Sequence, residues 1–418
     1  MSTDVAIRPR RRRIIAAGVI GNVLEWYDFS IYGFFAPQIG ATFFAGTDRL
    51  TQILAAFSVF AAGYHARPLG AIVIGIIGDR RGRSTALLVS IGGMIVSTLG
   101  MGLVPGHASI GIAAPILLTV LRIVQGLAVG GESAIANVFM VENAPPGRRA
   151  LASAINGAGY AVGIQLASLT ALACSSLLTP AELQDWGWRI PFWLSLLVAV
   201  TGFWLRRTLK DLAQPAGEQP SPLAEVLANH LPLVLRIAGL TAFAAVGFQG
   251  AFIYIAEWLQ TVAGASPVDT FKVTSWSMLL VTPVSLLFGW WADHAGRRGL
   301  LLASAVLGVV GSVPFFMLMQ AGSIYCGQAG FVLALSIQFG VQGAMMVEIT
   351  PANIRCTALA IGNNIGWSIL GGLTPLAATW LTARTGDALA PAWLVAAAAA
   401  ITAVTLLVTA DPFRSKIR

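Results

Sequence analysis

The stretch Gly75-Ile76-Ile77-Gly78-Asp79-Arg80-Arg81-Gly82-Arg83 returns in altered form as Gly289-Trp290-Trp291-Ala292-Asp293-His294-Ala295-Gly296-Arg297-Arg298. In both copies an aspartate and at least two arginines directly follow a long apolar run, and the copies lie about half the chain apart. Such a repeat in an apolar chain is typical of proteins that pack two similar helical bundles around a central site. The repeat therefore predicts two halves with a charged loop at the same point of each.

The composition excludes an ordinary water-soluble globular protein. Of the 418 residues, 56% are hydrophobic and 11% are charged, and the mean hydropathy is +0.76. An average soluble domain carries about 25% charged residues. The apolar runs recur at the length that crosses a hydrocarbon core of about 30 Å. We therefore expect a multi-pass membrane protein whose apolar surface contacts a lipid bilayer.

Several classes of protein are excluded by what the sequence lacks. The net charge of +8 does not indicate nucleic-acid binding, because the basic residues form short clusters between apolar runs. Cys174, Cys326 and Cys356 are scattered, so they indicate neither a disulfide framework nor a metal site. No phosphate-binding loop or serine-hydrolase motif is present. We expect no enzymatic activity, no cofactor and no metal, with energy taken from an ion gradient or from the substrate gradient.

Twelve spans are predicted from windows of about 20 residues. A polar, proline-rich stretch from Gln214 to Pro222 divides them six and six. The predicted fold is an all-α membrane protein with an N-terminal six-helix bundle (1–205), a cytoplasmic linker (206–231) and a C-terminal six-helix bundle (232–418). The spans lie near residues 14–42, 50–77, 85–105, 109–140, 150–178, 188–206, 232–262, 272–292, 299–319, 322–347, 355–382 and 391–409.

The basic residues predict the orientation. Most of the 26 Lys and Arg residues fall on one side of a twelve-span chain, and cytoplasmic loops are enriched in these residues. Both termini are therefore predicted to lie in the cytoplasm, with the chain in a bacterial inner membrane. The basic N-terminus resembles a signal peptide, but the apolar stretch after it contains Glu25 and Asp28 and lacks a clear cleavage site. We interpret this stretch as the first helix.

Five further motifs resemble those of one transporter family. Together with the two charged loops, they resemble the metabolite:proton symporter family of the major facilitator superfamily over nearly the whole chain. The resemblance implies twelve helices in two bundles that import a substrate with protons by alternating access. The motifs are Gly21-Asn22-Val23-Leu24-Glu25-Trp26-Tyr27-Asp28-Phe29, Arg67-Pro68-Leu69-Gly70, Arg122-Ile123-Val124-Gln125-Gly126-Leu127-Ala128-Val129-Gly130-Gly131-Glu132, Trp186-Gly187-Trp188-Arg189-Ile190-Pro191-Phe192, and the segment from Gly371-Gly372 to Pro375.

Two departures from the family pattern bear on function. His65 stands two residues before Arg67, where the family pattern leads us to expect an apolar residue, and this could alter the pore lining or reflect a different substrate. Only a few residues follow the twelfth span, so the long coiled-coil tail of osmosensing members is missing, which weakens an osmolyte-sensing role.

Acidic residues inside predicted spans are the candidates for proton coupling. A carboxylate at the centre of a membrane helix costs about 2.5 kcal/mol or more on insertion scales, so it needs a partner, water or a function. Glu25 and Asp28 are three residues apart and share one helix face. We predict that one of them carries the proton and that Glu132 acts as a relay. The alternative is that these residues form permanent ion pairs that only hold the bundle together.

Basic residues inside predicted spans are the candidates for substrate binding. Arg67 and Arg122 fall near the middle of the second and fourth spans, and a guanidinium matches the geometry of a carboxylate. Gln125 shares a helix face with Arg122. Pairing with Glu25, Asp28 or Glu132 is the alternative for the arginines, and amides also hold membrane helices together. The remaining substrate candidates are Tyr32, Gln249, Gln342 and Asn363.

The two charged loops are predicted to gate the pathway. An aspartate can hold the N-terminal end of a neighbouring helix through its positive dipole. The arginines can pair across the interface between the halves, and these contacts would break as the halves rock. We predict this role for Asp79, Arg80 and Arg83, and a weaker counterpart for Asp293 and Arg297.

The sequence predicts symport of a small organic acid, such as a di- or tricarboxylate, with protons. The alternative is proton-coupled uptake of a zwitterionic osmolyte such as betaine or proline, because such family members share many of the motifs. A non-transporting sensor and a drug exporter are weaker alternatives. The expected partners are the small-molecule substrate, protons and lipid, and we expect the monomer to be functional.

Overall fold

The computed structural model describes residues 21–196 and 223–411, apart from residues 82 and 131, and within these ranges it contains helices and no strands. The first half begins with a helix at 21–34 and ends with the start of another at 190–196. Between them lie α2 (Ala36–Phe43), α3 (Arg49–Arg81), α4 (Arg83–Leu103), α5 (His107–Ile110), α6 (Ala113–Val129), α7 (Glu132–Glu142), α8 (Arg149–Leu177), α9 (Pro180–Asp185) and η1 (Gly187–Arg189).

The second half begins with α11 (Leu223–Asn229), which lies in the predicted linker. The remaining elements are α12 (Leu231–Phe248), η3 (Gln249–Tyr254), α13 (Ile255–Thr261), α14 (Pro267–Ala295), α15 (Arg298–Gln320), α16 (Ile324–Ile349), α17 (Arg355–Asn364), η4 (Ile365–Gly371), α18 (Gly372–Thr385) and α19 (Ala390–Leu407).

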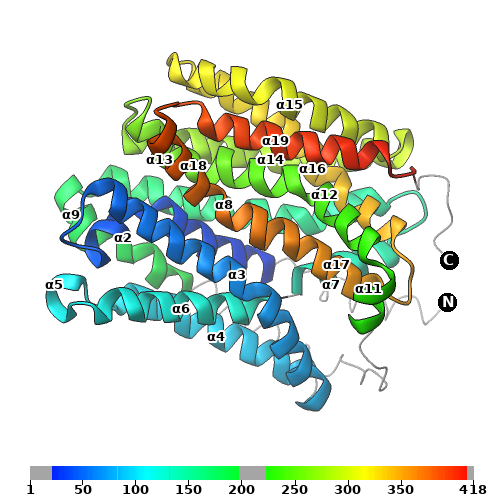
Figure 1. Ribbon diagram of the computed structural model, residues 1–418, viewed down its shortest axis with the longest axis horizontal. Helices are drawn as coiled ribbons and strands as arrows, with labels where there is room; N and C mark the ends of the chain where they lie inside the picture. Colours follow the sequence, from blue (N-terminus) through cyan, green and yellow to red (C-terminus); the bar gives the residue numbers. More distant parts are fainter. Residues whose placement is uncertain (1–20, 82, 131, 197–222, 412–418) are drawn as a thin grey trace, which may run out of the picture.

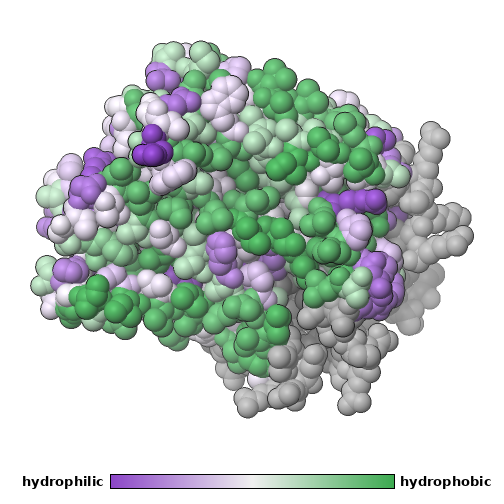
Figure 2. Space-filling model, viewed as in Figure 1, coloured by the Kyte–Doolittle hydropathy of each residue, from purple (hydrophilic) through white to green (hydrophobic). Residues whose placement is uncertain are grey.

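Every predicted span contains helix in the described ranges, which confirms the all-α prediction. The long helices run side by side along the longest axis of the molecule (Figure 1). Seven of the described helices are long and apolar enough to cross a membrane by length and composition alone. Hydrophobic residues cover most of the visible face, and hydrophilic residues gather toward its two ends (Figure 2). This pattern fits an apolar band that contacts lipid.

Glycines bring α3 and α6 into close contact. A Cβ on Gly126 of α6 would lie 2.0 Å from the carbonyl oxygen of Gly63 on α3. A Cβ on Gly130 would lie 2.2 Å from the carbonyl oxygen of Arg67. Glycine permits this approach because it has no side chain at the interface. Since α3 carries Arg67 and α6 carries Arg122, the packing places both guanidinium groups in the same bundle.

Two helices of the second half contain π-helical segments. η3 joins α12 to α13, and η4 joins α17 to α18. A π-helical turn holds more residues than an α-helical turn, and such turns often mark functional sites. Both segments lie at the interface between the halves, because Gln249 is near Tyr64 and Trp367 contacts Trp26. The interface also includes α8, which packs along α14 and α16, and α3, which packs along η4 and α18.

Candidate functional site

A cavity of about 70 Å³ lies between the two halves. Such a volume holds a few water molecules. The first half contributes residues from helix 21–34, α3, α7 and α8, and the second half contributes residues from α16, α17 and η4. The lining side chains are Trp26, Arg67, Asn137, Ser153, Asn156, Tyr160, Phe339, Gln342, Met346, Leu359, Asn363 and Trp367.

Aromatic rings form one wall of this cavity. The Trp26 ring lies 4.8 Å from Trp367 and 5.4 Å from Tyr160, measured between centroids. Phe248 packs edge-on against Trp26 at 5.2 Å. These rings come from both halves of the chain. The wall can therefore contact a ligand cation through ring faces.

Unpaired donors lie beside the aromatic wall. Arg67 Nη2 donates a hydrogen bond to Glu25, and both side chains of this ion pair are 5% exposed. Arg67 Nε and Nη1 and the Trp26 indole nitrogen have no hydrogen-bond partner among the described residues. Buried N–H groups are normally paired. Arg67 and Trp26 both line the cavity, and their side chains suit a ligand with an anionic or acceptor group. The predicted alternative of pairing between Arg67 and Glu25 is thus observed, while a role for Glu25 in proton coupling stays a prediction.

A hydrogen-bonded chain runs through the first half from Arg122 to Asp28. Arg122 Nη1 donates to Gln125 Oε1, and Gln125 Nε2 donates to Thr98 Oγ1 at 2.8 Å. Thr98 Oγ1 donates in turn to Asp28 Oδ2 at 2.8 Å. All four side chains are buried. Arg122 and Asp28 are therefore joined through two neutral side chains and not by a direct ion pair.

Arg122 does not line the cavity and lies in an aromatic cage. Its guanidinium carbon lies 4.3 Å from the ring centre of Phe29, 4.5 Å from that of Tyr32 and 5.1 Å from that of Phe60. Phe29 also contacts Arg67, whose guanidinium carbon lies 5.4 Å from the centre of the Phe29 ring. Buried cation–π contacts of this kind are worth about 2 kcal/mol. One phenyl ring thus contacts both arginines.

The other predicted substrate residues lie in different places. Gln342 and Asn363 line the cavity, and Gln342 accepts a hydrogen bond from Gln338. Tyr32 donates to the Ala56 carbonyl at 3.2 Å and does not line the cavity. Gln249 opens η3 and is buried without a hydrogen-bond partner in the described ranges. The structure brings Arg67, Gln342 and Asn363 together, and substrate contact by the others stays a prediction.

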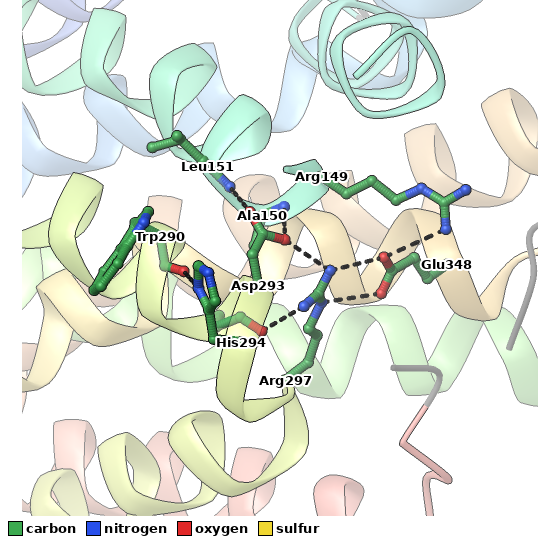
Figure 3. Close-up of polar contacts among 9 residues, drawn as sticks. Arg149, Ala150, Leu151, Trp290, Asp293, His294, Arg297 and Glu348 are labelled. Atoms are coloured by element: carbon green, nitrogen blue, oxygen red, sulfur yellow. Dashed lines mark hydrogen bonds and ion pairs between the residues drawn. The ribbon is translucent and has the colours of Figure 1, made fainter. Parts of the chain in front are cut away.

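The second charged loop caps a helix of the first half. Asp293 accepts hydrogen bonds from the backbone N–H groups of Ala150 and Leu151 at 3.0 Å, at the start of α8 (Figure 3). Arg297 donates to Asp293 at 2.9 Å and to Glu348 at 3.1 Å. The predicted contact between an aspartate and a helix N-terminus is therefore present at Asp293, and gating stays a prediction.

Two more ion pairs cross between the halves at this arginine-rich end. Arg355 donates to Glu142, and Arg149 lies 3.9 Å from Glu348 (Figure 3 shows the latter). In each half the glutamate lies at or next to the end of one helix and the arginine begins the next, seven residues later. Each half thus binds the other half's arginine. Sequence reasoning missed these residues, although the repeated Glu-to-Arg spacing was a visible signal.

The opposite end of the bundle is also closed. Arg49 at the start of α3 lies 3.9 Å from the buried Glu257 of α13. Phe271 of α14 packs against Phe34 at 5.6 Å, and Tyr254 packs against Phe57 at 6.1 Å. All of these contacts join the first half to the second. The cavity is therefore held between contacts at both ends.

Some predicted residues cannot be placed. The side chains of Asp79, Arg80, Arg83 and Glu132 lie outside the described residues, although their backbone belongs to α3, α4 and α7. The suggestion that His65 alters the pore lining is not supported, because His65 lies on the exposed face of α3 and its ring bonds the Ala61 carbonyl at 2.7 Å.

Replacing Glu142 with glutamine is expected to open the arginine-rich end more often. The pair with Arg355 crosses the halves, and the glutamate is 40% exposed, so its loss should cost about 1 kcal/mol of closure. In a variant whose native cysteines are replaced, alkylation of Ser153→Cys in the cavity should become about fivefold faster. Lys272→Gln, which removes an exposed pair within one half, should leave the rate unchanged. Equal acceleration by both substitutions contradicts the gate assignment.

The chain is similar to known proteins over most of its length. A family model of the Major Facilitator Superfamily matches residues 18–363. The proline/betaine transporter of Escherichia coli (strain K12) is 31% identical over 96% of this chain and 84% of its own length. A putative proline/betaine transporter of Staphylococcus aureus (strain MSSA476) is 32% identical over 95% of this chain and 87% of its own. A D-xylose-proton symporter structure aligns with a TM-score of 0.77 at 18% identity, covering 97% of this chain and 99% of that one; the last likeness concerns the fold alone.

Proposed function

The chain belongs to the Major Facilitator Superfamily and is a multi-pass membrane transporter, and from that premise we propose that it imports a small zwitterion of the proline or betaine class together with protons. The relatives named as proline/betaine transporters favour this alternative over the di- or tricarboxylate first expected. We retain the bacterial plasma membrane and cytoplasmic termini as parts of the proposal.

One observation carries the choice of a zwitterion. Arg67 and Trp26, whose buried N–H groups have no partner among the described residues, line the same cavity as Tyr160 and Trp367. Guanidinium and indole donors suit a carboxylate. Aromatic faces attract quaternary and secondary ammonium groups. The carboxylate of betaine or proline can therefore bind Arg67 and Trp26, while its ammonium group contacts the aromatic rings of the same cavity.

The charge of the cavity argues against a dicarboxylate. Among the described lining residues Arg67 is the one charged side chain, and Glu25 already balances it. A dicarboxylate would bring two negative charges to a site with no net positive charge, and burying uncompensated charge is costly. A zwitterion adds no net charge. Arg122 offers no direct compensation, because it lies behind Phe29 and Tyr32.

Alternating access fits the contacts at both ends of the bundle. The Glu142 and Glu348 pairs close the arginine-rich end, and the Glu257 pair with the Phe271 contacts closes the other. Breaking either set would open the cavity to one side. For the protons, Glu25 and Asp28 are buried carboxylates near the cavity or connected to it, and we propose that they bind and release the proton during the cycle.

Betaine and proline are expected to raise the unfolding temperature of the purified transporter, because a ligand that binds the folded state stabilises it. Trp367→Leu should weaken betaine binding about thirtyfold, since a desolvated cation–π contact is worth about 2 kcal/mol. Proline should lose less affinity because a secondary ammonium can keep hydrogen bonds. Trp380→Leu on the exposed face of α18 serves as the matched control.

Two outcomes would overturn the substrate class. Stabilisation by dicarboxylates and not by betaine or proline would restore the organic-acid interpretation. Equal loss of betaine binding in Trp367→Leu and Trp380→Leu would remove the aromatic wall from the site.

A further inference from the structure

We infer that Thr98 and Gln125 transmit the charge state of Asp28 to the substrate cavity, by controlling how firmly Arg122 is held. The inference rests on the proposed proton coupling and identifies the side chains that connect the proton to the substrate. Thr98 and Gln125 would be positioning residues, because they act through Asp28 and Arg122 and do not line the cavity.

The direction of every hydrogen bond in the chain is fixed by chemistry. A guanidinium can only donate, so Gln125 must present its carbonyl oxygen to Arg122. The amide nitrogen of Gln125 then faces Thr98 and donates to its hydroxyl oxygen. The Thr98 hydroxyl hydrogen is therefore free to donate to Asp28. All donors point toward the carboxylate, which is the arrangement expected when Asp28 carries a negative charge.

Protonation of Asp28 changes the end of this chain. Its Oδ1 atom accepts no hydrogen bond from a described residue, so a proton from water can bind there without displacing Thr98. The neutral carboxyl group accepts more weakly, and the hold on Gln125 and Arg122 loosens with it. Release of the proton to water on the other side of the membrane restores the charge and the tighter chain.

A change at Arg122 can reach the cavity through one ring. Phe29 lies 4.3 Å from the Arg122 guanidinium and 5.4 Å from that of Arg67, which lines the cavity. Gly63 lies directly against the Arg122 side chain, so the guanidinium has little room to move without displacing this ring. The path from the proton to the substrate is therefore continuous: Asp28, Thr98, Gln125, Arg122, Phe29 and Arg67.

Several other groups face Asp28 and Arg122. Ser195 from residues 190–196 and Arg122 from α6 lie near Asp28, together with Thr98 from α4. Arg122 faces Tyr32, Tyr64 and Arg67 in addition to Asp28. Glu25, the other carboxylate near this path, is paired with Arg67 at its far end. Asp28 is the carboxylate that accepts from Thr98, so Asp28→Asn tests the relay and leaves the Glu25 pair in place.

The test measures cavity exposure without any substrate. The rate of alkylation of Ser153→Cys, in the cysteine-replaced protein, is followed from about pH 5 to about pH 8 and divided at each pH by the rate for a free thiol in solution, because only the thiolate reacts. Thr98→Val keeps the shape of the side chain and removes its hydroxyl, and Thr98→Ser keeps the hydroxyl. We expect this relative rate to change severalfold with pH in the parent and in Thr98→Ser, and less than about twofold in Thr98→Val and Asp28→Asn. Thermal unfolding confirms that each variant is folded.

A second readout uses transport. Thr98→Val should reduce proton-driven accumulation of radiolabelled betaine at least about tenfold more than it reduces exchange of betaine at equal pH, and Thr98→Ser should not. The relay is overturned if alkylation in the parent does not depend on pH in this way. It is also overturned if Asp28→Asn or Thr98→Val keeps the parent's pH dependence. Absence of betaine and proline uptake by the parent would overturn the proposed function alone, because the alkylation result does not depend on substrate.

Discussion

Uptake of betaine and proline is expected to fall at least about 100-fold when Arg67 is replaced by glutamine, since hydrogen bonds to a charged group are worth about 3 kcal/mol. Arg67 is the one charged side chain among the described residues that line the cavity. Two of its nitrogen atoms, Nε and Nη1, have no hydrogen-bond partner among the described residues. Removing the guanidinium deletes the proposed carboxylate contact and breaks the buried ion pair with Glu25. The measurement is initial uptake into vesicles with an imposed pH gradient.

Loss of folding must be separated from loss of the site. Breaking a buried ion pair by removing one partner costs about 3–5 kcal/mol, so Arg67→Gln alone could unfold the protein. The double variant Arg67→Gln with Glu25→Gln leaves no unbalanced charge and should regain most of the stability but none of the uptake. His65→Gln lies two residues away on the exposed face of α3 and should transport normally. Betaine binding of normal affinity in the double variant would remove Arg67 from the site.

Gly126→Ala is expected to destabilise the protein by about 3 kcal/mol or more, at the upper end for overpacking. The added Cβ would lie 2.0 Å from the carbonyl oxygen of Gly63 and 2.9 Å from the Cβ of Ala66. Backbone cannot rotate away as a side chain can, so α3 and α6 must separate. Thermal unfolding and size-exclusion profiles of the purified protein measure the effect.

Gly92→Ala is the matched control for this substitution. It also lies in a long helix, and its Cβ would meet nothing within 4 Å. Alanine favours helix over glycine by about 1 kcal/mol, so this variant should be as stable as the parent or slightly more stable. Equal stability of the two alanine variants would contradict the close packing of α3 and α6.

The architecture was predictable because a membrane imposes simple rules on a sequence. Long apolar runs must form helices, since unpaired backbone groups are not tolerated in lipid. The π-helical segments within these helices were not predictable in this way. Nothing in the composition of Gln249–Tyr254 or Ile365–Gly371 distinguishes a π-helical from an α-helical segment, because both satisfy the backbone locally. The division of the first span at Phe35 was hidden for the same reason.

The charged residues of the site were predictable, and the aromatic ones were not. Glu25, Asp28, Arg67 and Arg122 stood out because charge inside a span is costly. Trp26 and Trp367 did not, because aromatic residues in a membrane protein usually pack or face lipid, and only the fold shows which rings meet at the cavity. Thr98 was missed because a threonine in a helix commonly bonds its own backbone.

Hydrogen-bond partners were the hardest feature to predict. Gln125 and Arg122 were correctly placed on one helix face. Both were predicted to bind substrate, and the hydrogen bonds of the Gln125 amide to Arg122 and Thr98 were not predicted. Asp293 was predicted from helix electrostatics to hold a neighbouring helix, and it does hold α8. The partners of Glu142 and Glu348 depend on how the halves dock, which no local pattern specifies.

Two equivalent ion pairs, Glu142 with Arg355 and Glu348 with Arg149, hold the arginine-rich end closed. Each pair links the halves by itself, so a chance substitution that removes one pair leaves an equivalent link in place. Single changes at these four positions should therefore be tolerated over generations, while simultaneous loss of both links should not. The duplication of the halves thus protects the closed state against mutation, in addition to building the pathway.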